Sequence, residues 1–147
     1  MVDKGLILRK LSVLDEYLKQ IEEYASITAE AYEGDWKVQR IVERTLQLMI
    51  ETCLDIGGHI ISDEKLRVPD TYADVFRILV ENGILSKTHL DAFEKMAKFR
   101  NIVVHDYEKV DPDIIVSILR KNLNDFERFR ASITGYLKNM ESKNNKR

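Results

Sequence analysis

The chain has a single cysteine, two prolines and six glycines among its 147 residues, and it has no long hydrophobic run. With Cys53 alone no internal disulfide can form, which favours a reducing compartment, and we expect the cytoplasm. No stretch approaches the roughly eighteen apolar residues of a membrane-spanning helix. The first ten residues hold only three consecutive aliphatic side chains, so we expect no signal peptide.

An excess of positive charge is also missing, because 23 Lys and Arg residues face 25 Asp and Glu residues. A net charge of -2 does not attract nucleic acid over long distances, so contact with RNA would need a local basic surface. The hydrophobic and charged fractions, 44% and 33%, are typical of a folded soluble protein. We expect one domain over residues 1–141 and a flexible basic tail over residues 142–147.

Apolar residues recur three and four positions apart along most of the chain, and no segment alternates as a strand does. This pattern predicts an all-α fold, an antiparallel bundle of about five helices. The expected helices cover residues 7–25, 35–61, 71–82, 86–105 and 111–140.

Helix boundaries have local signals. Asp35, Ser86 and Asp111 can cap helices that follow them, and Pro112 suits a first helical position. Gly83 after Asn82 predicts a helix end at which the glycine adopts the left-handed backbone conformation.

The second expected helix has two apolar stripes, which predicts a central position. Gly57 and Gly58 lie in its last turns, where each costs roughly 1 kcal/mol relative to alanine. The pair indicates either a bend or the close approach of another backbone.

Residues 100–107 read Arg-Asn-Ile-Val-Val-His-Asp-Tyr, the part of the chain most suited to chemistry. Arg100 carries a planar cation suited to phosphate oxygens. His105 can transfer protons near neutral pH, because an unperturbed imidazole has a pKa of roughly 6.5. Together they suit phosphodiester cleavage without a metal.

A helix turns by about 100° per residue, so Asn101 and His105 share a face, whereas Arg100 lies about 140° from His105. Either the helix ends just before His105, or the site is assembled from two copies of the chain. In a purely structural alternative, Arg100 pairs with an acidic neighbour and His105 caps the last helix carbonyls.

The segment resembles the signature of the HEPN superfamily, in which an Arg, a polar residue, three further residues and a His follow one another. With Tyr107 two positions after the His, it is similar to the HepT-like branch. The resemblance covers about residues 5–140, and its upstream part comprises Leu46, Gln47, residues 53–60, Pro69, Tyr72, Phe76 and Leu79.

The resemblance implies a homodimer in which both motifs line one cleft. It also implies a ribonuclease toxin of a toxin-antitoxin pair that needs no cofactor, with tRNA as a candidate substrate. The neighbouring 2′-hydroxyl would attack the phosphorus, leaving a cyclic phosphate. His105 would be general base, or general acid from the second subunit, Arg100 would stabilise the phosphoryl oxygens, and Asn101 would orient His105 or bind phosphate.

Tyr107 matches the tyrosine that accepts AMP in HepT-like proteins. The donor enzyme there is a partner antitoxin, a small nucleotidyltransferase of the MntA type. Without the resemblance, Tyr107 would be read as a surface aromatic after a helix.

Two alternatives stay open. Glu51, Asp55 and His59 lie four apart and could offer metal ligands, although a hydrogen-bonded polar seam is the commoner outcome. The whole chain could instead be a non-catalytic helical module that binds a nucleotidyltransferase or a nucleotide.

Overall fold

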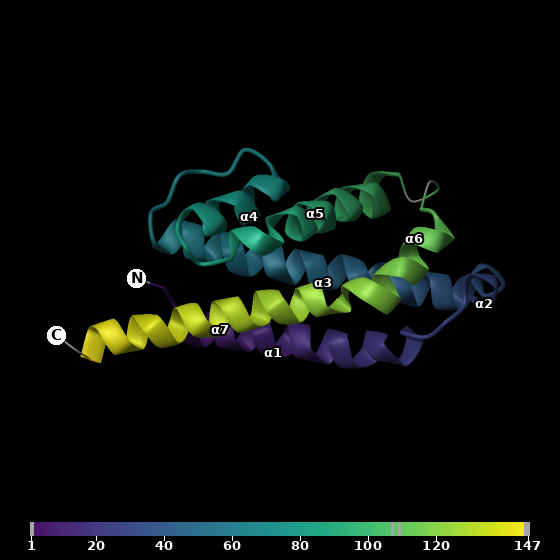
Figure 1. Cartoon of the computed structure of the whole chain (residues 1–147), viewed down its shortest axis with the longest axis horizontal. Coiled ribbons are helices and arrows are strands. Elements are labelled where there is room, and N and C mark those ends of the chain that lie inside the picture. The colour runs from purple at the N-terminus through teal and green to yellow at the C-terminus, as the bar shows by residue number, and fades with distance from the viewer. Residues whose placement is uncertain (1, 107, 109, 146–147) are drawn as a thin grey trace.

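The chain folds into helices that pack lengthwise against one another (Figure 1). The computed structural model describes residues 2–106, 108 and 110–145, and none of these residues lies in a strand. In chain order the α-helices are α1 (Lys4–Ile21), α2 (Ala29–Glu33), α3 (Trp36–Asp63), α4 (Tyr72–Glu81), α5 (Leu90–His105), α6 (Pro112–Ser117) and α7 (Leu123–Asn145). The predicted all-α bundle is confirmed.

Helix α3 is central, as its two apolar stripes predict. It contacts α1, α4, α5 and α7. Figure 1 shows α4 and α5 on one side of α3, and α1 with α7 on the other. Cys53 is buried within α3, and burial raises the pKa of its thiol, so it serves as a small core residue.

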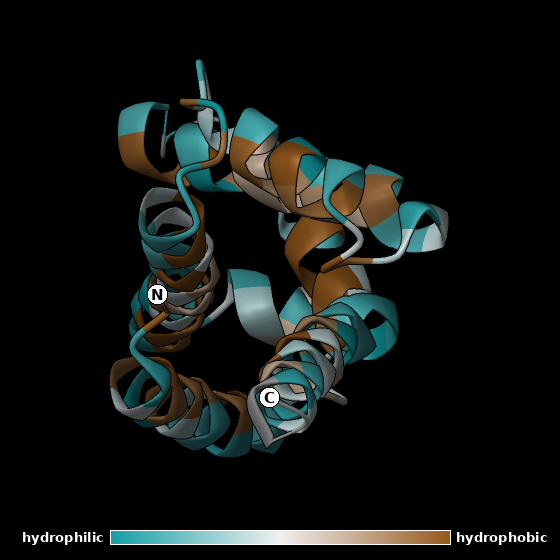
Figure 2. Cartoon of the chain, turned by 90° about the vertical axis from the view of Figure 1, so that its left-hand side faces the viewer, coloured by the Kyte–Doolittle hydropathy of each residue, from teal (hydrophilic) through white to brown (hydrophobic). Residues whose placement is uncertain are grey.

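The core includes three phenylalanines from three helices. The ring centroids of Phe76 and Phe93 lie 5.4 Å apart, and the Phe129 ring is nearly perpendicular to both, with its centroid 6.2 and 6.1 Å from theirs. This cluster joins the α4–α5 pair to α7. Figure 2 shows hydrophobic and hydrophilic residues alternating around the helices, as expected for amphipathic helices.

The helix-end signals act largely as predicted. The Asp35 carboxylate accepts hydrogen bonds from two backbone amides of the first turn of α3, and Asp111 caps α6 with Pro112 as its first residue. Gly83 has a φ of 71° after α4. Ser86 caps the 3-10 turn Lys87–His89 that precedes α5, and not α5 itself.

Two features were not predicted. Residues 29–33 form the short helix α2, which buries Tyr32 and lets its hydroxyl donate to Glu43 at 3.3 Å. The fifth expected helix is also interrupted by a π-helical turn over Ile118–Asn122, so α6 is set at an angle to α7 (Figure 1).

Gly57 makes room for the side chains of a neighbouring helix, and not for another backbone. A Cβ at Gly57 would lie 2.7 Å from Val75 Cγ1 and 3.1 Å from Leu79 Cδ1, so its absence lets side chains of α4 pack closely against α3. Nothing lies within 4 Å of a Cβ placed at Gly58.

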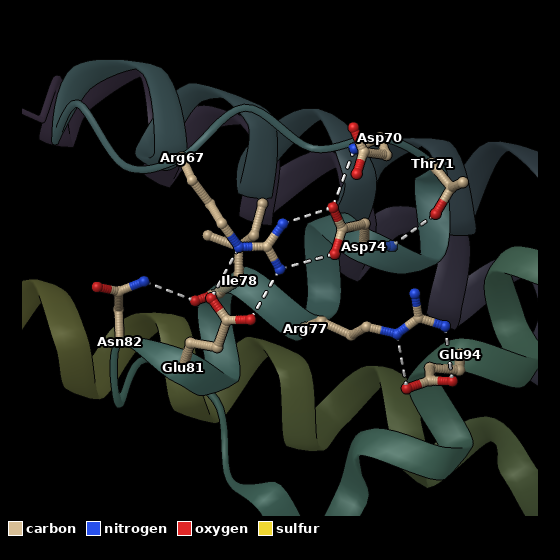
Figure 3. Close-up of polar contacts among 9 residues, drawn as sticks. All are labelled: Arg67, Asp70, Thr71, Asp74, Arg77, Ile78, Glu81, Asn82 and Glu94. Carbon is tan, nitrogen blue, oxygen red and sulfur yellow. Dashed lines mark hydrogen bonds and ion pairs between the residues drawn. The ribbon is translucent and has the colours of Figure 1, made fainter.

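The loop between α3 and α4 is held by Arg67 (Figure 3). Its guanidinium donates to both oxygens of Asp74 at 2.8 Å and to Glu81 at 2.7 and 3.0 Å. Hydrogen bonds from Arg67, and from the Asp70 backbone amide, lower the pKa of Asp74 to about 2. Arg77 and Glu94, paired at 3.2 Å, link α4 to α5.

Candidate active site at the end of α5

The polar motif lies at the C-terminal end of α5. The Asp106 amide donates to the Ile102 carbonyl at 2.8 Å, so helical hydrogen bonding continues through His105. Of the two alternatives, the one in which the helix ends just before His105 is therefore excluded. Within one copy, Arg100 and His105 point away from each other by about 140°. Asn101 and His105 are exposed, whereas Arg100 is largely covered.

Arg100 is held by residues of three helices. Its Nε and Nη2 donate to Glu51 Oε1 at 3.1 and 3.0 Å, and Gln47 Nε2 donates to the same oxygen at 3.1 Å. The guanidinium carbon lies 4.6 Å from the ring centroid of Tyr72. Nη1 donates to Asn101 Oδ1 at 3.3 Å. The guanidinium plane is therefore fixed before any ligand binds.

The remaining donors decide what this group can bind. A guanidinium has five N–H groups, and Glu51 and Asn101 take three of those on Arg100. Among the residues that the structure describes, one N–H on each terminal nitrogen has no acceptor and can donate to a phosphate oxygen. Pairing with Glu51 thus orients the cation without using up its capacity for an anion.

One half of the purely structural alternative holds, because Arg100 does pair with an acidic neighbour. The other half does not. His105 has no hydrogen-bond partner among the residues that the structure describes, and its imidazole is open to solvent. Tyr107, the predicted AMP acceptor, lies outside the described residues.

The three polar residues on α3 do not converge. Glu51 turns toward Arg100, while Asp55 pairs with Lys10 and lies 3.4 Å from His59. In the described part of the chain, no group of three His, Cys, Asp or Glu side chains is arranged to hold a metal ion. No helix of the described residues is long and apolar enough to cross a membrane.

Sequence reasoning did not assign a site role to Gln47 or Tyr72. Gln47 is four residues before Glu51, and such pairs interact on a helix surface. Tyr72 is remote in sequence, and only folding brings its ring to Arg100. Both residues belong to the upstream part of the HepT-like pattern, which was the available signal.

Comparisons with known proteins show the family of the whole chain. The family model described as "Ribonuclease HepT-like" matches residues 14–133. The mRNA nuclease HepT of Shewanella oneidensis is 32% identical over 124 residues, which cover 84% of this chain and 92% of that protein. The tRNA nuclease HepT of Aphanizomenon flos-aquae is 27% identical over 146 residues, or 97% of each chain.

A solved structure is similar over nearly the same length. It is described as the tri-AMPylated Shewanella oneidensis HEPN toxin in complex with its MNT antitoxin. This chain matches it with a TM-score of 0.81 and 31% identity, over 92% of this chain and 99% of that one. The protein therefore belongs to the HepT-like ribonuclease family of HEPN proteins.

Proposed function

We propose that this chain is the metal-independent endoribonuclease toxin of a toxin-antitoxin pair, with Arg100 and His105 as its catalytic residues. The observation that carries the proposal is the oriented guanidinium of Arg100, on the same helix as exposed Asn101 and His105; two of its N–H groups have no acceptor among the described residues. Membership of a ribonuclease family supports the same reaction class.

The reaction needs a proton acceptor, a proton donor and a fixed positive charge. One His105 takes the proton of the ribose 2′-hydroxyl while its oxygen bonds to phosphorus, and the bond from phosphorus to the 5′-oxygen breaks. A second imidazole gives a proton to that leaving oxygen. Arg100 stabilises the charge on the non-bridging oxygens, and Asn101 orients the imidazole or binds phosphate. The products are a cyclic phosphate and a 5′-hydroxyl.

We propose that the site is completed at the cleft of a homodimer. An unbroken α5 separates Arg100 from His105 in one copy, and a two-fold axis would bring a second pair of these side chains to the same cleft. The substrate is RNA. The two nuclease relatives are described as acting on mRNA and on tRNA, so tRNA stays one candidate and the cleft's shape decides between them.

We further propose that an MntA-like nucleotidyltransferase antitoxin silences the toxin by AMPylating Tyr107. Each added phosphodiester brings one negative charge near the motif. At about 5 Å and an effective dielectric near 20, it repels an RNA phosphate by roughly 3 kcal/mol, less where solvent screens it. The AMPylated relative supports this regulation.

The central experiment expresses the chain alone and follows growth and RNA ends. Wild type should arrest growth, and its cleavage should produce cyclic-phosphate RNA ends whether or not EDTA is present. His105→Ala should lose cleavage by roughly 10²- to 10⁴-fold with an unchanged helical spectrum. Normal cleavage by His105→Ala would refute the assignment. A chain that never arrests growth, yet changes the partner's affinity for nucleotide, would favour the non-catalytic binding module.

The silencing step has its own test. Co-expression with an MntA-like nucleotidyltransferase should add AMP masses to the peptide that contains Tyr107. Tyr107→Phe should escape both the mass increase and the loss of toxicity. Continued silencing of Tyr107→Phe by nucleotidyl transfer would refute Tyr107 as the acceptor.

A further inference from the structure

The N-terminal half of α3 carries an exposed basic and aromatic stripe, formed by Trp36, Lys37, Arg40 and Arg44. All four side chains are exposed, and Trp36 is 65% exposed. Tyr72 is also exposed, at 46%, but its ring packs against Arg100, whereas the indole of Trp36 lies among the cations of the stripe.

The stripe leads to the candidate active site. At about 100° per residue, Arg40, Arg44, Gln47 and Glu51 lie within about 60° of one another on α3. Glu51 binds Arg100, so the same edge of α3 borders α5. Figure 1 shows the C-terminal end of α5 over the N-terminal half of α3. From Glu51 to Arg40 the helix rises about 16 Å, a distance spanned by a few nucleotides.

The charges of the stripe are available to a ligand. Arg67, Arg77 and Arg130 all form ion pairs with carboxylates. Arg40, Arg44 and Lys37 form none with the residues that the structure describes.

The nearest acidic groups of α3 have other partners. Asp35 caps the first turn, and Glu43 accepts from the Tyr32 hydroxyl. Lys37 Nζ lies 5.8 Å from the Trp36 ring centroid, which places a cation beside the indole. Unpaired cations beside an exposed ring suit a strand that offers both phosphates and base faces.

We propose that the α3 stripe binds the single-stranded RNA that flanks the scissile phosphate, with Arg40 and Arg44 on backbone phosphates and Trp36 under a base. The substrate class rests on the proposed ribonuclease function. The stripe supplies the local basic surface that a chain of net charge -2 needs for RNA. It binds backbone and base faces, so it adds affinity with little sequence preference.

Trp36 is the single tryptophan, so its fluorescence reports directly on the stripe. The full chain carrying His105→Ala, which blocks cleavage, is titrated with an oligoribonucleotide of about ten nucleotides. Saturable quenching that weakens with salt is expected. Arg40→Ala/Arg44→Ala should bind roughly tenfold more weakly, and its logarithmic salt slope should fall by about 1.4, or about 0.7 per lost phosphate contact.

The matched control removes two cations elsewhere. Lys19 and Lys138 are exposed residues of α1 and α7, so Lys19→Ala/Lys138→Ala makes the same change in net charge. Equal affinities for the two double variants would overturn the proposal. A stripe variant whose oligomeric mass changes, with RNA affinity following that change, would assign the face to contact between copies and would also overturn it.

Cleavage by the same variants on the wild-type background separates the two proposals. Loss of the stripe should raise KM and leave kcat near wild type, because the stripe lies outside the reacting groups. A chain that cleaves RNA with no dependence on Arg40 and Arg44 refutes the stripe alone. Binding through the stripe without any cleavage refutes the ribonuclease, and neither binding nor cleavage refutes both.

Discussion

Glu51 places a negative charge beside Arg100, the residue proposed to bind an RNA phosphate. The hydrogen bonds of Glu51 explain this arrangement. Its Oε1 atom accepts from Arg100 Nε, from Arg100 Nη2 and from Gln47 Nε2. The carboxylate holds the edge of the guanidinium formed by Nε and Nη2, and Asn101 Oδ1 accepts from Nη1. Glu51 is therefore a positioning residue for the proposed reaction.

Replacement of Glu51 tests this role. Glu51→Ala should lower kcat/KM for RNA by roughly 10- to 100-fold, because the guanidinium loses its orientation. Glu51→Gln keeps an accepting oxygen and should lose less. Asp55→Asn, one turn further along α3 and paired with Lys10, should cleave like wild type. Faster cleavage by Glu51→Ala would mean that the carboxylate competes with phosphate, and would exclude positioning.

Ionisation of Asp74 should make the stability of the folded chain depend on pH. Its pKa in the folded chain, about 2, is below the usual 3.8, so the folded state favours the ionised carboxylate. The resulting stabilisation is complete above about pH 4 and is lost as pH falls toward about 2. The urea midpoint of wild type should exceed that of Asp74→Asn at pH 6.

The difference between the two midpoints should shrink progressively below about pH 4. Asp91→Asn is the control, because Asp91 and Lys95 form a pair on the solvent-exposed surface and such pairs contribute little. A difference for Asp74→Asn that stays constant from pH 6 to pH 2 would contradict the role of ionisation.

At the scale of elements, the contact between α3 and α4 depends on one missing Cβ. Gly57→Ala gains up to about 1 kcal/mol of helix propensity. The new Cβ meets the stiff side chain of buried Val75 at 2.7 Å, and such overpacking costs about 1–3 kcal/mol. We therefore expect a net loss of stability in urea denaturation.

Gly58→Ala is the matched substitution at the next position. Its Cβ meets nothing within 4 Å, so it should stabilise the chain by about 0.5–1 kcal/mol. Because both variants gain similar helix propensity, the difference between them isolates the packing of α4. A Gly57→Ala chain as stable as Gly58→Ala would show that α4 can shift freely.

At the scale of the whole molecule, the question is whether two copies share a site. Arg100→Ala and His105→Ala are each expected to be inactive alone. If one copy lends Arg100 and the other His105, a mixed dimer keeps one intact combination. Random co-assembly should then recover at most roughly a quarter of wild-type cleavage, since half of the dimers are mixed and each keeps one Arg100 and one His105 instead of two.

The readout is cleavage by the two variants before and after co-refolding. The control mixes Arg100→Ala with Arg100→Ala/His105→Ala, which leaves no Arg100 in any dimer and should stay inactive. No recovery in a verified mixed dimer would refute the proposal that Arg100 of one copy and His105 of the other suffice for cleavage.

Much of the fold follows from local pattern. The spacing of Ile7, Leu11 and Leu14 suffices for α1, and Asp35 marks the start of α3. The short helix α2 was missed because five residues carry too little periodicity. The π-helical turn was missed because Leu119 and Phe126, seven apart, fit an uninterrupted helix equally well.

The sequence by itself determined the helical class, the polar motif at residues 100–107 and the resemblance to the HepT-like family, because each is written in neighbouring residues or in their order. Tertiary structure alone decided that Glu51 and Tyr72 hold Arg100, since 49 residues separate Glu51 from Arg100. It also decided that α5 continues through His105, because Asp106 bonds back to Ile102. Helix packing determines which residues remote in sequence come into contact, and the local spacing of residues does not predict those contacts.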